Sequence, residues 1–460
     1  MLTMTLAQIV HAVEGCLYGQ ATLPSDVQIQ GLFTDTRKPM HGGVFVALRG
    51  ARFDAHAFLT TAVENGARVL VVEQPLDGLD VVQVLVPDTR IALGQLAAAW
   101  CAIWRAQGGK LVALTGSNGK TTTKEMLASI LRQAGSTLAT RGNLNNDIGV
   151  PLMLAELDAN HMFAVIEMGA NHPGEIAYLT ALARPDVALI TNTGRAHLQG
   201  FGGKQGVILA KGEIFAGLAE QGVAVINLDD EGAATWLPGL NSLRLTFSMN
   251  PDSDADVRGQ YSAELAVLRI QRADELLELR LQVAGEHNAH NALAAAAAAW
   301  ALGLAPSAIQ AGLESFTGVA GRLQRKLGQG GCVLWDDTYN ANPDSLQAGI
   351  RAVSAQGSET WLILGDMGEL GEDAPALHSE AGKLIRELGV TRVFTVGALA
   401  RRAAEAFGQG ARAFATQDEL LSELKPMLQP GVQLLVKGSR SSRMENIVQA
   451  LIKPMEDAAC

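Results

Sequence analysis

The chain has 460 residues, of which 48% are hydrophobic and 18% are charged, and its formal net charge is −11 at pH 7. This length and apolar content suit about three globular domains and exclude general disorder. The negative charge argues against a nucleic-acid coat and against an anionic membrane surface, although local amides and cations can still bind phosphate. We therefore expect small-molecule substrates, with no nucleic acid and no membrane as partner.

The cysteines and the apolar runs indicate the compartment. The four cysteines are far apart, so neither a C-x-x-C zinc site nor a disulfide scaffold is indicated. The N-terminal segment lacks the basic start and the small-residue cleavage site of a signal peptide. The most apolar run, residues 292–305, is shorter than the ~20 residues of a membrane span and is expected to form a buried helix. We predict a cytoplasmic protein and expect a monomer.

The first part of the chain, residues 1–85, is expected to form a small α/β domain. Short apolar runs at 44–48 and 69–72 are separated there by Gly, Asp and Pro. A helix is expected next, over residues 90–107, because Asp88 can serve as its N-cap and two glycines end it.

Residues 86–318 are expected to form the largest domain, a central ATP-binding unit. Apolar runs alternate there with helical patterns at 111–114, 163–166, 187–190 and 223–226, which predicts βαβ units and a mostly parallel sheet. After a boundary near 318–321 the alternation resumes at 333–335, 361–364, 393–396 and 434–436. Residues 319–460 are therefore predicted to form a Rossmann-like C-terminal domain, and the fold class is three-domain α/β.

The strongest local motif is a glycine-rich loop that follows an apolar run and precedes a helical pattern. Its glycines allow backbone N–H groups to face phosphate oxygens, and the helix N-terminus adds positive potential. Lys120 can reach β/γ-phosphates and the Thr121 hydroxyl can bind Mg²⁺. The loop is shorter than a standard P-loop, since Leu114 stands where that motif has its first glycine. The alternative is a glycine turn with an incidental lysine. The predicted nucleotide-binding residues are Thr115, Gly116, Ser117, Asn118, Gly119, Lys120, Thr121 and Thr122.

An acid follows the next apolar run. Glu167 directly follows the apolar run of residues 163–166, and it precedes a segment rich in glycine and amide side chains. A carboxylate at the end of a neighbouring strand is a suitable Mg²⁺ ligand, because Mg²⁺ prefers hard oxygen donors. The alternative is an ordinary surface acid at a strand end, and the composition of the segment favours function.

Further polar clusters extend the pattern beyond a phosphate loop. They are Thr-Gly-Arg-Ala-His-Leu at 193–198, Ala-Lys-Gly-Glu at 210–213, His-Asn-Ala-His-Asn at 287–291 and Asp-Asp-Thr-Tyr-Asn-Ala-Asn-Pro-Asp-Ser at 336–345. Together with the TGSNGKTTT loop, they resemble the Mur ligase family, the ATP-dependent amide-forming enzymes of peptidoglycan precursor synthesis. The resemblance spans essentially the whole chain.

The resemblance implies a specific reaction. The segments 34–38, 44–50, 53–58, 141–151 and 364–371 are similar to the family member that appends D-alanyl-D-alanine to UDP-N-acetylmuramoyl-tripeptide through an acyl phosphate. Another ligase of the superfamily, such as a folylpolyglutamate synthetase, is the main alternative, but it lacks an equivalent UDP-sugar domain. A nucleotide-dependent switch without ligase chemistry is a second alternative.

The resemblance also implies the ligands of two Mg²⁺ ions and of ATP. Thr121 and Glu167 would hold the first ion, and His197 and Lys211 the second, with Lys211 carbamylated by CO₂. The alternatives for His197 and Lys211 are a capping or surface histidine and an ordinary helix lysine. Asn288 and Asn291 would read the adenine, with helix capping as the alternative for Asn288. In the third domain the implied residues are Arg322 for ATP phosphates, Asp337 for the ribose and Tyr339 for stacking on adenine; a linker charge and a core aromatic are the alternatives for Arg322 and Tyr339.

Two further polar segments are candidates for binding the other substrate. Thr34, Asp35, Thr36 and Arg37 form a turn-like cluster in which Arg37 suits a diphosphate, and an ordinary solvated turn is an equal alternative. Asn143, Asn145 and Asn146 lie in a polar loop expected to face the peptidyl substrate or the phosphates.

Overall fold

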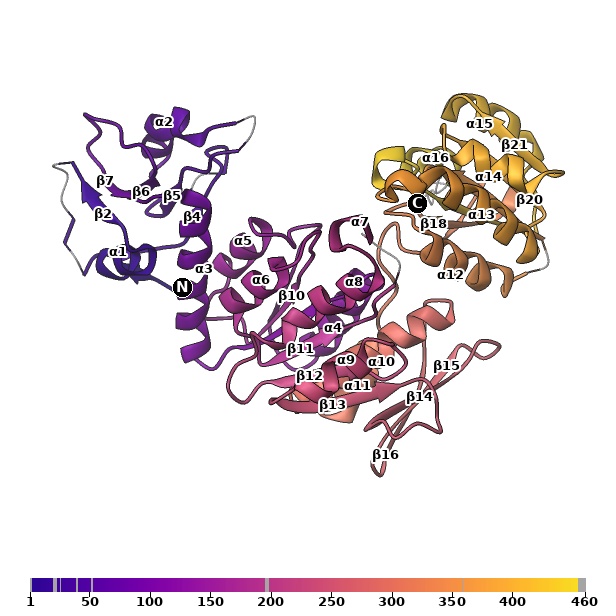
Figure 1. Ribbon diagram of the computed structural model, residues 1–460, viewed down its shortest axis with the longest axis horizontal. Coiled ribbons are helices and arrows are strands. Elements are labelled where there is room, and N and C mark those ends of the chain that lie inside the picture. The colour runs from indigo at the N-terminus through magenta and orange to yellow at the C-terminus, as the bar shows by residue number, and fades with distance from the viewer. Residues whose placement is uncertain are drawn as a thin grey trace, which may run out of the picture.

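The computed structural model describes residues 2–19, 23–24, 26–38, 40–50, 53–194, 198–357 and 359–453. The described chain contains sheets of two, five, nine and six strands. Figure 1 shows an N-terminal unit in indigo and a C-terminal unit in orange and yellow, both on the same side of a central unit in magenta. The predicted three-unit α/β class with mostly parallel sheets is confirmed.

The N-terminal unit contains a small sheet with the order β2-β7-β6-β5-β4, parallel except for the pair β2–β7. The expected strand at 44–48 ends at Val46, and the one at 69–72 has the predicted bounds. The strands are β1 Met4–Thr5, β2 Cys16–Tyr18, β3 Gln28–Ile29, β4 Leu32–Phe33, β5 Val44–Val46, β6 Val69–Val72 and β7 Val82–Leu85; the helices are α1 Leu6–Val13, η1 Ala55–Phe58 and α2 Leu59–Glu64.

One long helix, α3 (Thr89–Ala106), connects the first unit to the central one. Asp88 caps it as predicted, since its carboxylate accepts the backbone N–H groups of Arg90 at 2.7 Å and Ile91 at 3.0 Å. The indole N–H groups of Trp100 and Trp104 donate to backbone carbonyls of the central unit at 2.9 and 2.8 Å. The apolar core on this side is continuous from the N-terminal sheet through α3 to the central sheet.

The central sheet has the order β16-β15-β14-β13-β12-β11-β8-β10-β9. All neighbouring pairs from β14 to β9 in this order, β8 included, are parallel. Alternate residues of its inner strands face two separate apolar cores, one of which is covered by α4 and α10. The strands are β8 Lys110–Thr115, β9 Thr137–Ala139, β10 Phe163–Glu167, β11 Val187–Ile190, β12 Val223–Asn227, β13 Leu243–Ser248, β14 Val257–Ser262, β15 Val267–Arg272 and β16 Glu275–Arg280.

The helices of the central unit include the expected alanine-rich one, α10, which is buried over most of its length. It ends at Ala301, earlier than expected, because Gly303 takes a positive φ of 83° and Pro306 begins α11. The helices are α4 Lys120–Arg132, α5 Gly149–Ala155, α6 Glu175–Ala183, α7 Leu198–Phe201, α8 Lys204–Gly212, η2 Glu213–Phe215, α9 Ala233–Trp236, η3 Leu237–Gly239, α10 Glu286–Ala301 and α11 Pro306–Glu314.

The C-terminal sheet has the order β17-β18-β22-β19-β20-β21 and is parallel except for β17–β18, with apolar cores on both faces. Its elements are β17 Gln324–Leu327, η4 Gln329–Gly331, β18 Val333–Asp337, α12 Pro343–Ser354, β19 Glu359–Gly365, η5 Gly371–Asp373, α13 Ala374–Glu387, β20 Arg392–Val396, α14 Ala400–Phe407, β21 Ala411–Phe414, α15 Gln417–Leu424, η6 Lys425–Met427, β22 Val432–Lys437, η7 Arg440–Ser442 and α16 Glu445–Leu451.

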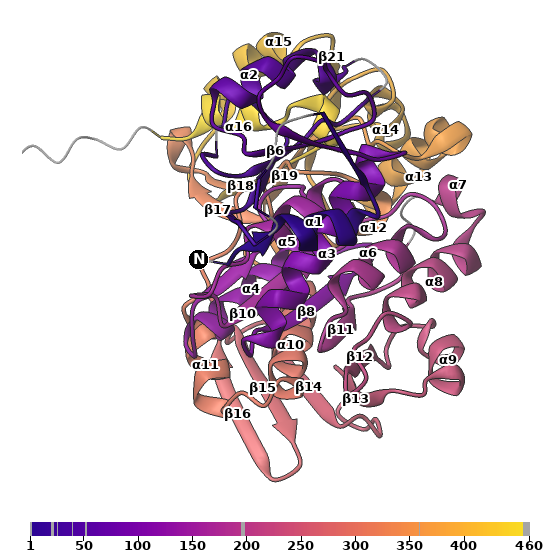
Figure 2. The same cartoon turned by 90° about the vertical axis from the view of Figure 1, so that its left-hand side faces the viewer.

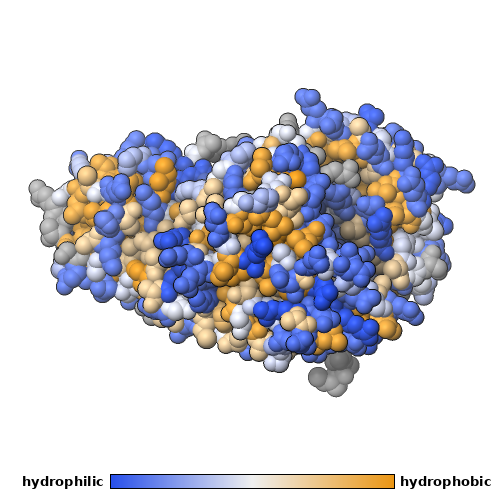
Figure 3. All heavy atoms as spheres, turned by 60° about the horizontal axis from the view of Figure 1, so that its bottom comes forward, coloured by the Kyte–Doolittle hydropathy of each residue, from blue (hydrophilic) through white to orange (hydrophobic). Residues whose placement is uncertain are grey.

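The described helices, the surface and the cysteines complete the account of the fold. None of the described helices combines the length and the apolar character that crossing a membrane requires. Polar and charged residues are interspersed with apolar ones over the face seen in Figure 3. Cys16, Cys101 and Cys332 are free, and Cys460 lies outside the described residues.

In Figure 2 the N-terminal and C-terminal units overlap, and both lie above the central sheet in this view. The phosphate loop follows the carboxyl end of β8, and Glu167 is the last residue of the neighbouring parallel strand β10. In open α/β sheets, ligands bind at this edge.

Candidate active site

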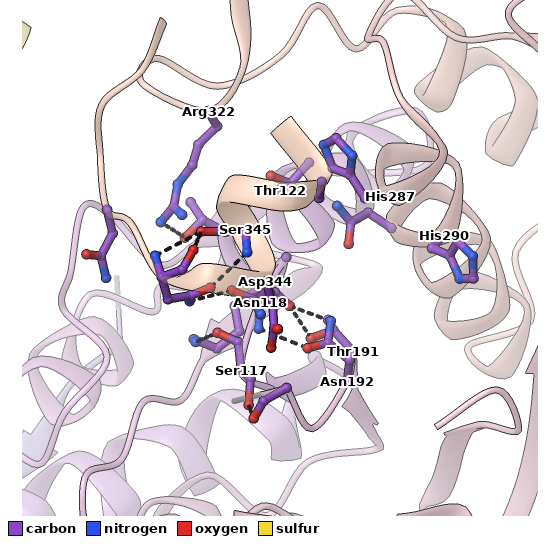
Figure 4. Close-up of a pocket in the computed structure, with 18 of the residues that line it drawn as sticks. Ser117, Asn118, Thr122, Thr191, Asn192, His287, His290, Arg322, Asp344 and Ser345 are labelled. Carbon is purple, nitrogen blue, oxygen red and sulfur yellow. Dashed lines mark hydrogen bonds between the residues drawn. The ribbon is translucent and has the colours of Figure 1, made fainter. Parts of the chain in front are cut away.

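A cavity of about 780 Å³ lies between the central unit and the C-terminal unit. The central unit contributes the phosphate loop, Glu167 and the first turns of α10, and the C-terminal unit contributes residues of its first linker, α12 and the loop after β19. In Figure 4, Arg322 reaches from the C-terminal unit toward the phosphate loop, and Asp344 and Ser345 lie opposite Asn118. The cavity is therefore built by both units.

The phosphate loop has the backbone that the motif predicts. Gly116 and Gly119 have positive φ angles of 150° and 79°. A Cβ atom on Gly116 would lie 2.0 Å from Thr191 Oγ1, and one on Gly119 would lie 2.2 Å from Asn291 Oδ1. Both positions therefore require glycine for space as well as for conformation. The loop opens directly into the N-terminus of α4, where orphan N–H groups favour an anion.

Lys120 is the first residue of α4, directly after this loop, and is partly buried. Its Nζ donates to the carbonyl oxygens of Gly116 at 2.6 Å and Ser117 at 3.3 Å. Burial lowers the pKa of the Lys120 amine, and the negative charge of Glu167 opposes this effect. The amine is thus held at the mouth of the loop, where a phosphate group can replace the carbonyl partners.

Glu167 ends β10 and is buried, with an exposed fraction of 2%. Its Oε1 accepts a hydrogen bond from Asn145 Nδ2 at 2.9 Å, whereas its Oε2 has no hydrogen-bond partner among the described residues. A buried carboxylate oxygen without a partner is unfavourable unless a cation or a donor reaches it. This oxygen fits a Mg²⁺ ion.

A second set of contacts positions Glu167. Its backbone N–H donates to Thr140 Oγ1 at 2.9 Å, and the buried Lys124 donates through Nζ to the Thr140 carbonyl at 2.5 Å. The sequence analysis missed Lys124 and Thr140. The available signal was a lysine on the same helix one turn after Lys120, which is unusual for a buried helix face.

The ligands available to a metal are few. Among the described residues, no group of three or more His, Cys, Asp and Glu side chains is arranged to hold a metal ion. Thr121 Oγ1 accepts a hydrogen bond from Arg322 Nη2 at 3.3 Å. Mg²⁺ in nucleotide sites commonly uses one or two protein ligands, substrate phosphates and water. Glu167 and Thr121 are compatible with such a site.

His197 and Lys211 are the residues implied for a second ion. His197 lies outside the described residues. Lys211, on α8, is 2% exposed, and its Nζ lies 5.5 Å from the centroid of the Phe201 ring. Burial, followed by the positive charge of Lys120, lowers the pKa of Lys211 to about 7. A large fraction of this amine is therefore uncharged at neutral pH, unlike that of an ordinary helix lysine.

Lys211 also lines a second cavity, of about 610 Å³, which extends from the phosphate loop to the start of α3. Lys120 and Asn145 line both cavities. Asn146 lines the second one, whereas Asn143 is exposed and belongs to neither lining. The asparagines of the predicted loop therefore have different surroundings: Asn145 supports Glu167, and Asn146 lines the second cavity.

The turn of residues 34–37 lies away from both cavities. Arg37 is mostly exposed and pairs with Asp35 at 2.8 Å. Hydrogen bonds from the Arg37 side chain and backbone lower the pKa of Asp35 to about 2. The carbonyl of Thr36 accepts Asn65 Nδ2 at 2.7 Å. The structure does not bring Thr34, Asp35, Thr36 and Arg37 together with the phosphate loop.

Asn288 and Asn291 lie on α10 beside the phosphate loop and line the first cavity. Gly285, not Asn288, precedes the first residue of the helix, and Asn288 Nδ2 donates to the Ala284 carbonyl at 2.7 Å. The capping alternative for Asn288 is therefore wrong. Asn291 Oδ1 accepts a hydrogen bond from Thr123 Oγ1 at 3.2 Å.

The C-terminal unit reaches the phosphate loop through polar contacts. The Arg322 guanidinium lies 3.8 Å from the centroid of the Tyr339 ring, so this arginine covers one face of the ring. Asn342 Nδ2 donates to Asn118 Oδ1 at 2.9 Å. Asp337 Oδ2 accepts the buried Lys437 Nζ at 2.5 Å. Arg322, Asp337 and Tyr339 all line the first cavity.

Comparison with known proteins agrees with this geometry. Residues 114–299 match the Mur ligase middle domain, and residues 321–440 match the Mur ligase, glutamate ligase domain. The UDP-N-acetylmuramoyl-tripeptide–D-alanyl-D-alanine ligase of Escherichia coli (strain K12) is 41% identical, with all of both chains covered. The enzyme of that name from Haemophilus influenzae is 40% identical, with 98% of this chain and 99% of the relative covered.

Solved structures show the same similarity. MurF from Acinetobacter baumannii has a TM-score of 0.89 and 39% identity, with 98% of each chain covered. MurF ligase from Thermotoga maritima in complex with ADP has a TM-score of 0.82 and 29% identity, covering 92% of this chain and 96% of that one. The two domain matches and the full-length similarity establish that this chain belongs to the Mur ligase family.

Proposed function

We propose that this chain is an ATP-dependent ligase that joins D-alanyl-D-alanine to UDP-N-acetylmuramoyl-tripeptide and releases ADP and phosphate. The observation that carries the proposal is the position of Lys120, which lines both cavities at the point where they meet. One cavity contains the phosphate loop, and the other extends toward the N-terminal unit. A nucleotide in the first and a carboxylate in the second would meet at this lysine.

The reaction requires positioning and neutralisation of charge more than covalent work by the protein. The terminal carboxylate of the tripeptide takes the γ-phosphoryl group of ATP, and the resulting acyl phosphate is attacked by the amine of the dipeptide. Lys120 and the N-terminus of α4 stabilise the negative charge of the phosphoryl group. The walls of the two cavities hold the two substrates in line.

Magnesium fits the site through two residues. Thr121 and Glu167 would hold the first ion, and Glu167 Oε2, which has no hydrogen-bond partner among the described residues, supports this role. The bound ion supplies charge neutralisation on the phosphate oxygens. Lys124 and Thr140 support the Glu167 backbone, and Asn145 holds its carboxylate by a hydrogen bond.

A second ion and a carbamylated Lys211 are part of the proposal. CO₂ reacts with an uncharged amine, and the burial of Lys211 together with its lowered pKa supplies one. The carbamate would replace a positive charge with an oxygen ligand, which Mg²⁺ prefers. His197 is proposed as the other protein ligand of this ion.

The nucleoside end of ATP is assigned to α10 and the C-terminal unit. Asn288 and Asn291 would read the adenine edge, because an amide both donates and accepts. Arg322 would leave Thr121 for the phosphates, Asp337 would bind the ribose, and Tyr339 would expose its ring to adenine. These changes require a relative movement of the units, for which Gly318 and Gly321, with φ angles of 106° and 71°, form a suitable hinge.

The remaining assignments concern the nucleotide sugar and the setting. We assign the UDP end to residues 1–85, with Thr34, Asp35, Thr36 and Arg37 near the diphosphate, and the peptidyl part to the second cavity, with Asn145 and Asn146 in its wall and Asn143 in the adjoining loop. Residues 86–318 form the ATP-binding domain and residues 319–460 the third domain in this assignment. A monomer in the cytoplasm is the expected setting.

A folylpolyglutamate-type activity is less favoured. The Mycobacterium tuberculosis folylpolyglutamate synthase is 18% identical with a TM-score of 0.62, which indicates a shared fold alone. The test is release of inorganic phosphate from ATP with UDP-N-acetylmuramoyl-tripeptide and D-alanyl-D-alanine, each omitted in turn. We expect release, and a product heavier by the dipeptide, only with both. The proposal would be contradicted if the same amount of phosphate were released when one of the two co-substrates is omitted. Activity with a folate and glutamate in their place would also contradict it.

A further inference from the structure

The side chain of Asn118, in the phosphate loop, binds the C-terminal unit. Its Oδ1 accepts a hydrogen bond at 2.9 Å from Nδ2 of Asn342, the residue before α12. Both residues line the first cavity. They are 224 positions apart in the chain, so their contact depends on how the two units are placed. A loop that is expected to hold phosphate therefore also holds the neighbouring unit.

The backbone of Asn118 is anchored to the segment that follows β11. Its N–H donates to Asn192 Oδ1 at 3.0 Å, and its carbonyl accepts Thr191 Oγ1 at 2.7 Å and Asn192 Nδ2 at 3.0 Å. The Ser117 N–H donates to the Asn192 carbonyl at 2.8 Å. Figure 4 shows Asn118 beside Thr191 and Asn192. The central unit thus fixes the point from which the Asn118 side chain extends before any nucleotide binds.

Asn342 is fixed by the C-terminal unit. Its Oδ1 accepts the Ser345 N–H at 2.8 Å, and its own N–H donates to Ser345 Oγ at 3.1 Å, so the two residues form a capping box at the start of α12. The apolar face of α12 is buried in the core of the C-terminal unit. The Asn342 amide therefore uses its oxygen to cap this helix and its nitrogen to bind Asn118.

Glycine at position 194 leaves room for this approach of the two units. A Cβ atom built on Gly194 would lie 2.9 Å from Asn118 Nδ2 and 3.2 Å from Oδ2 of Asp344, which belongs to α12. Nδ2 of Asn118 thus faces Gly194, while its Oδ1 faces Asn342. A larger residue at 194 would enter the space in which the phosphate loop meets α12.

We propose that Asn118 is a positioning residue that aligns the C-terminal unit with the phosphate loop, so that both can bind one ATP molecule. This inference rests on the proposed division of ATP between the two units. In that division, the hydrogen bond from Arg322 to Thr121 at 3.3 Å is given up when phosphate and Mg²⁺ bind. The side chains of Asn118 and Asn342 are not assigned to the nucleotide, so their bond persists and is the fixed point about which the C-terminal unit turns.

The size of the effect follows from the kind of contact. Both partners are already held by their own units, so little side-chain freedom is lost when they meet. A neutral hydrogen bond between such groups changes an equilibrium constant by about fivefold. The affinity for a nucleotide that must touch both units should depend on this bond by that factor.

The test is calorimetric titration of a non-hydrolysable ATP analogue with Mg²⁺, without the UDP substrate. Asn342→Ser keeps a good helix cap but is too short to reach Asn118, and Asn118→Ala removes the acceptor. Each variant should bind the analogue about fivefold more weakly than wild type. The double variant should also bind about fivefold more weakly, because both changes remove the same contact.

A matched control is Thr416→Ala, which removes the N-cap of α15 in the same unit, at a position outside both cavities. It should lower the thermal stability and leave the affinity for the analogue unchanged. Binding of UDP-N-acetylmuramoyl-tripeptide should stay within about twofold of wild type in every variant, since one hydrogen bond between the other two units is removed.

Three results would overturn the inference. One is unchanged affinity for the analogue in either single variant. Another is a double variant that shows the product of the single effects, about 25-fold, because independent changes add in free energy. The third is a parallel loss of UDP-substrate binding, which would show damage beyond this contact. A wild-type chain that does not bind the analogue would instead overturn the proposed function.

Discussion

Replacement of Lys211 by methionine should abolish ligase turnover and yet stabilise the fold. The amine has its ordinary pKa of 10.5 in the unfolded chain and a pKa of about 7 in the folded protein, chiefly because it is buried. This difference between the unfolded and folded pKa values, at about 1.4 kcal/mol per pKa unit, lowers the free energy of unfolding by roughly 4 kcal/mol at pH 7. Methionine has a similar length and carries no charge, so it removes the penalty.

The pH dependence follows from the sign of this shift. Between pH 7 and 10.5 the unfolded chain binds more protons at this site than the folded protein, so stability rises with pH across that window. The advantage of Lys211→Met should therefore be largest at pH 7 and below. It should shrink to about 1.5 kcal/mol at pH 9.5.

The assay is chemical denaturation of both proteins at pH 7 and 9.5, in nucleotide-free buffer depleted of CO₂. Lys204→Met, at a partly exposed position of the same helix, is the matched control and should show little pH-dependent difference. A lysine with a purely structural role would give the opposite result, namely a less stable methionine variant. Equal stability differences at the two pH values would also refute the reasoning.

The other predictions concern the phosphate loop and its supports. Lys120→Ala should lower kcat by at least about 100-fold, since it removes the cation of the loop, while binding of the UDP substrate by calorimetry stays within a factor of about three. Lys124→Met should raise the Mg²⁺ concentration for half-maximal turnover by about tenfold, because Thr140 loses its support, and the exposed Lys383→Met should not. Arg322→Ala should raise the KM for ATP about tenfold by steady-state kinetics; an unchanged KM would remove this arginine from the site.

The sequence by itself determined the features that depend on local chemistry. Asp88 caps α3 because a short acidic side chain before a helix can reach the first free N–H groups, whatever the rest of the fold does. The loop before Lys120 needs glycine for its dihedral angles, and the apolar runs define the strands that end there. The order of these signals along the chain was enough to predict the fold class and the phosphate loop that ends at Lys120.

Only the tertiary structure decided which distant residues meet. Lys124 looks like a surface lysine in the sequence, but the packing of α4 against β9 and β10 places it under Thr140 and Glu167. Arg322 is 201 residues from Thr121 in the chain, and the two side chains meet because the C-terminal unit faces the phosphate loop across the cavity. Burial and charge at such positions depend on every element that surrounds them, and neither is encoded in the neighbouring residues of the sequence.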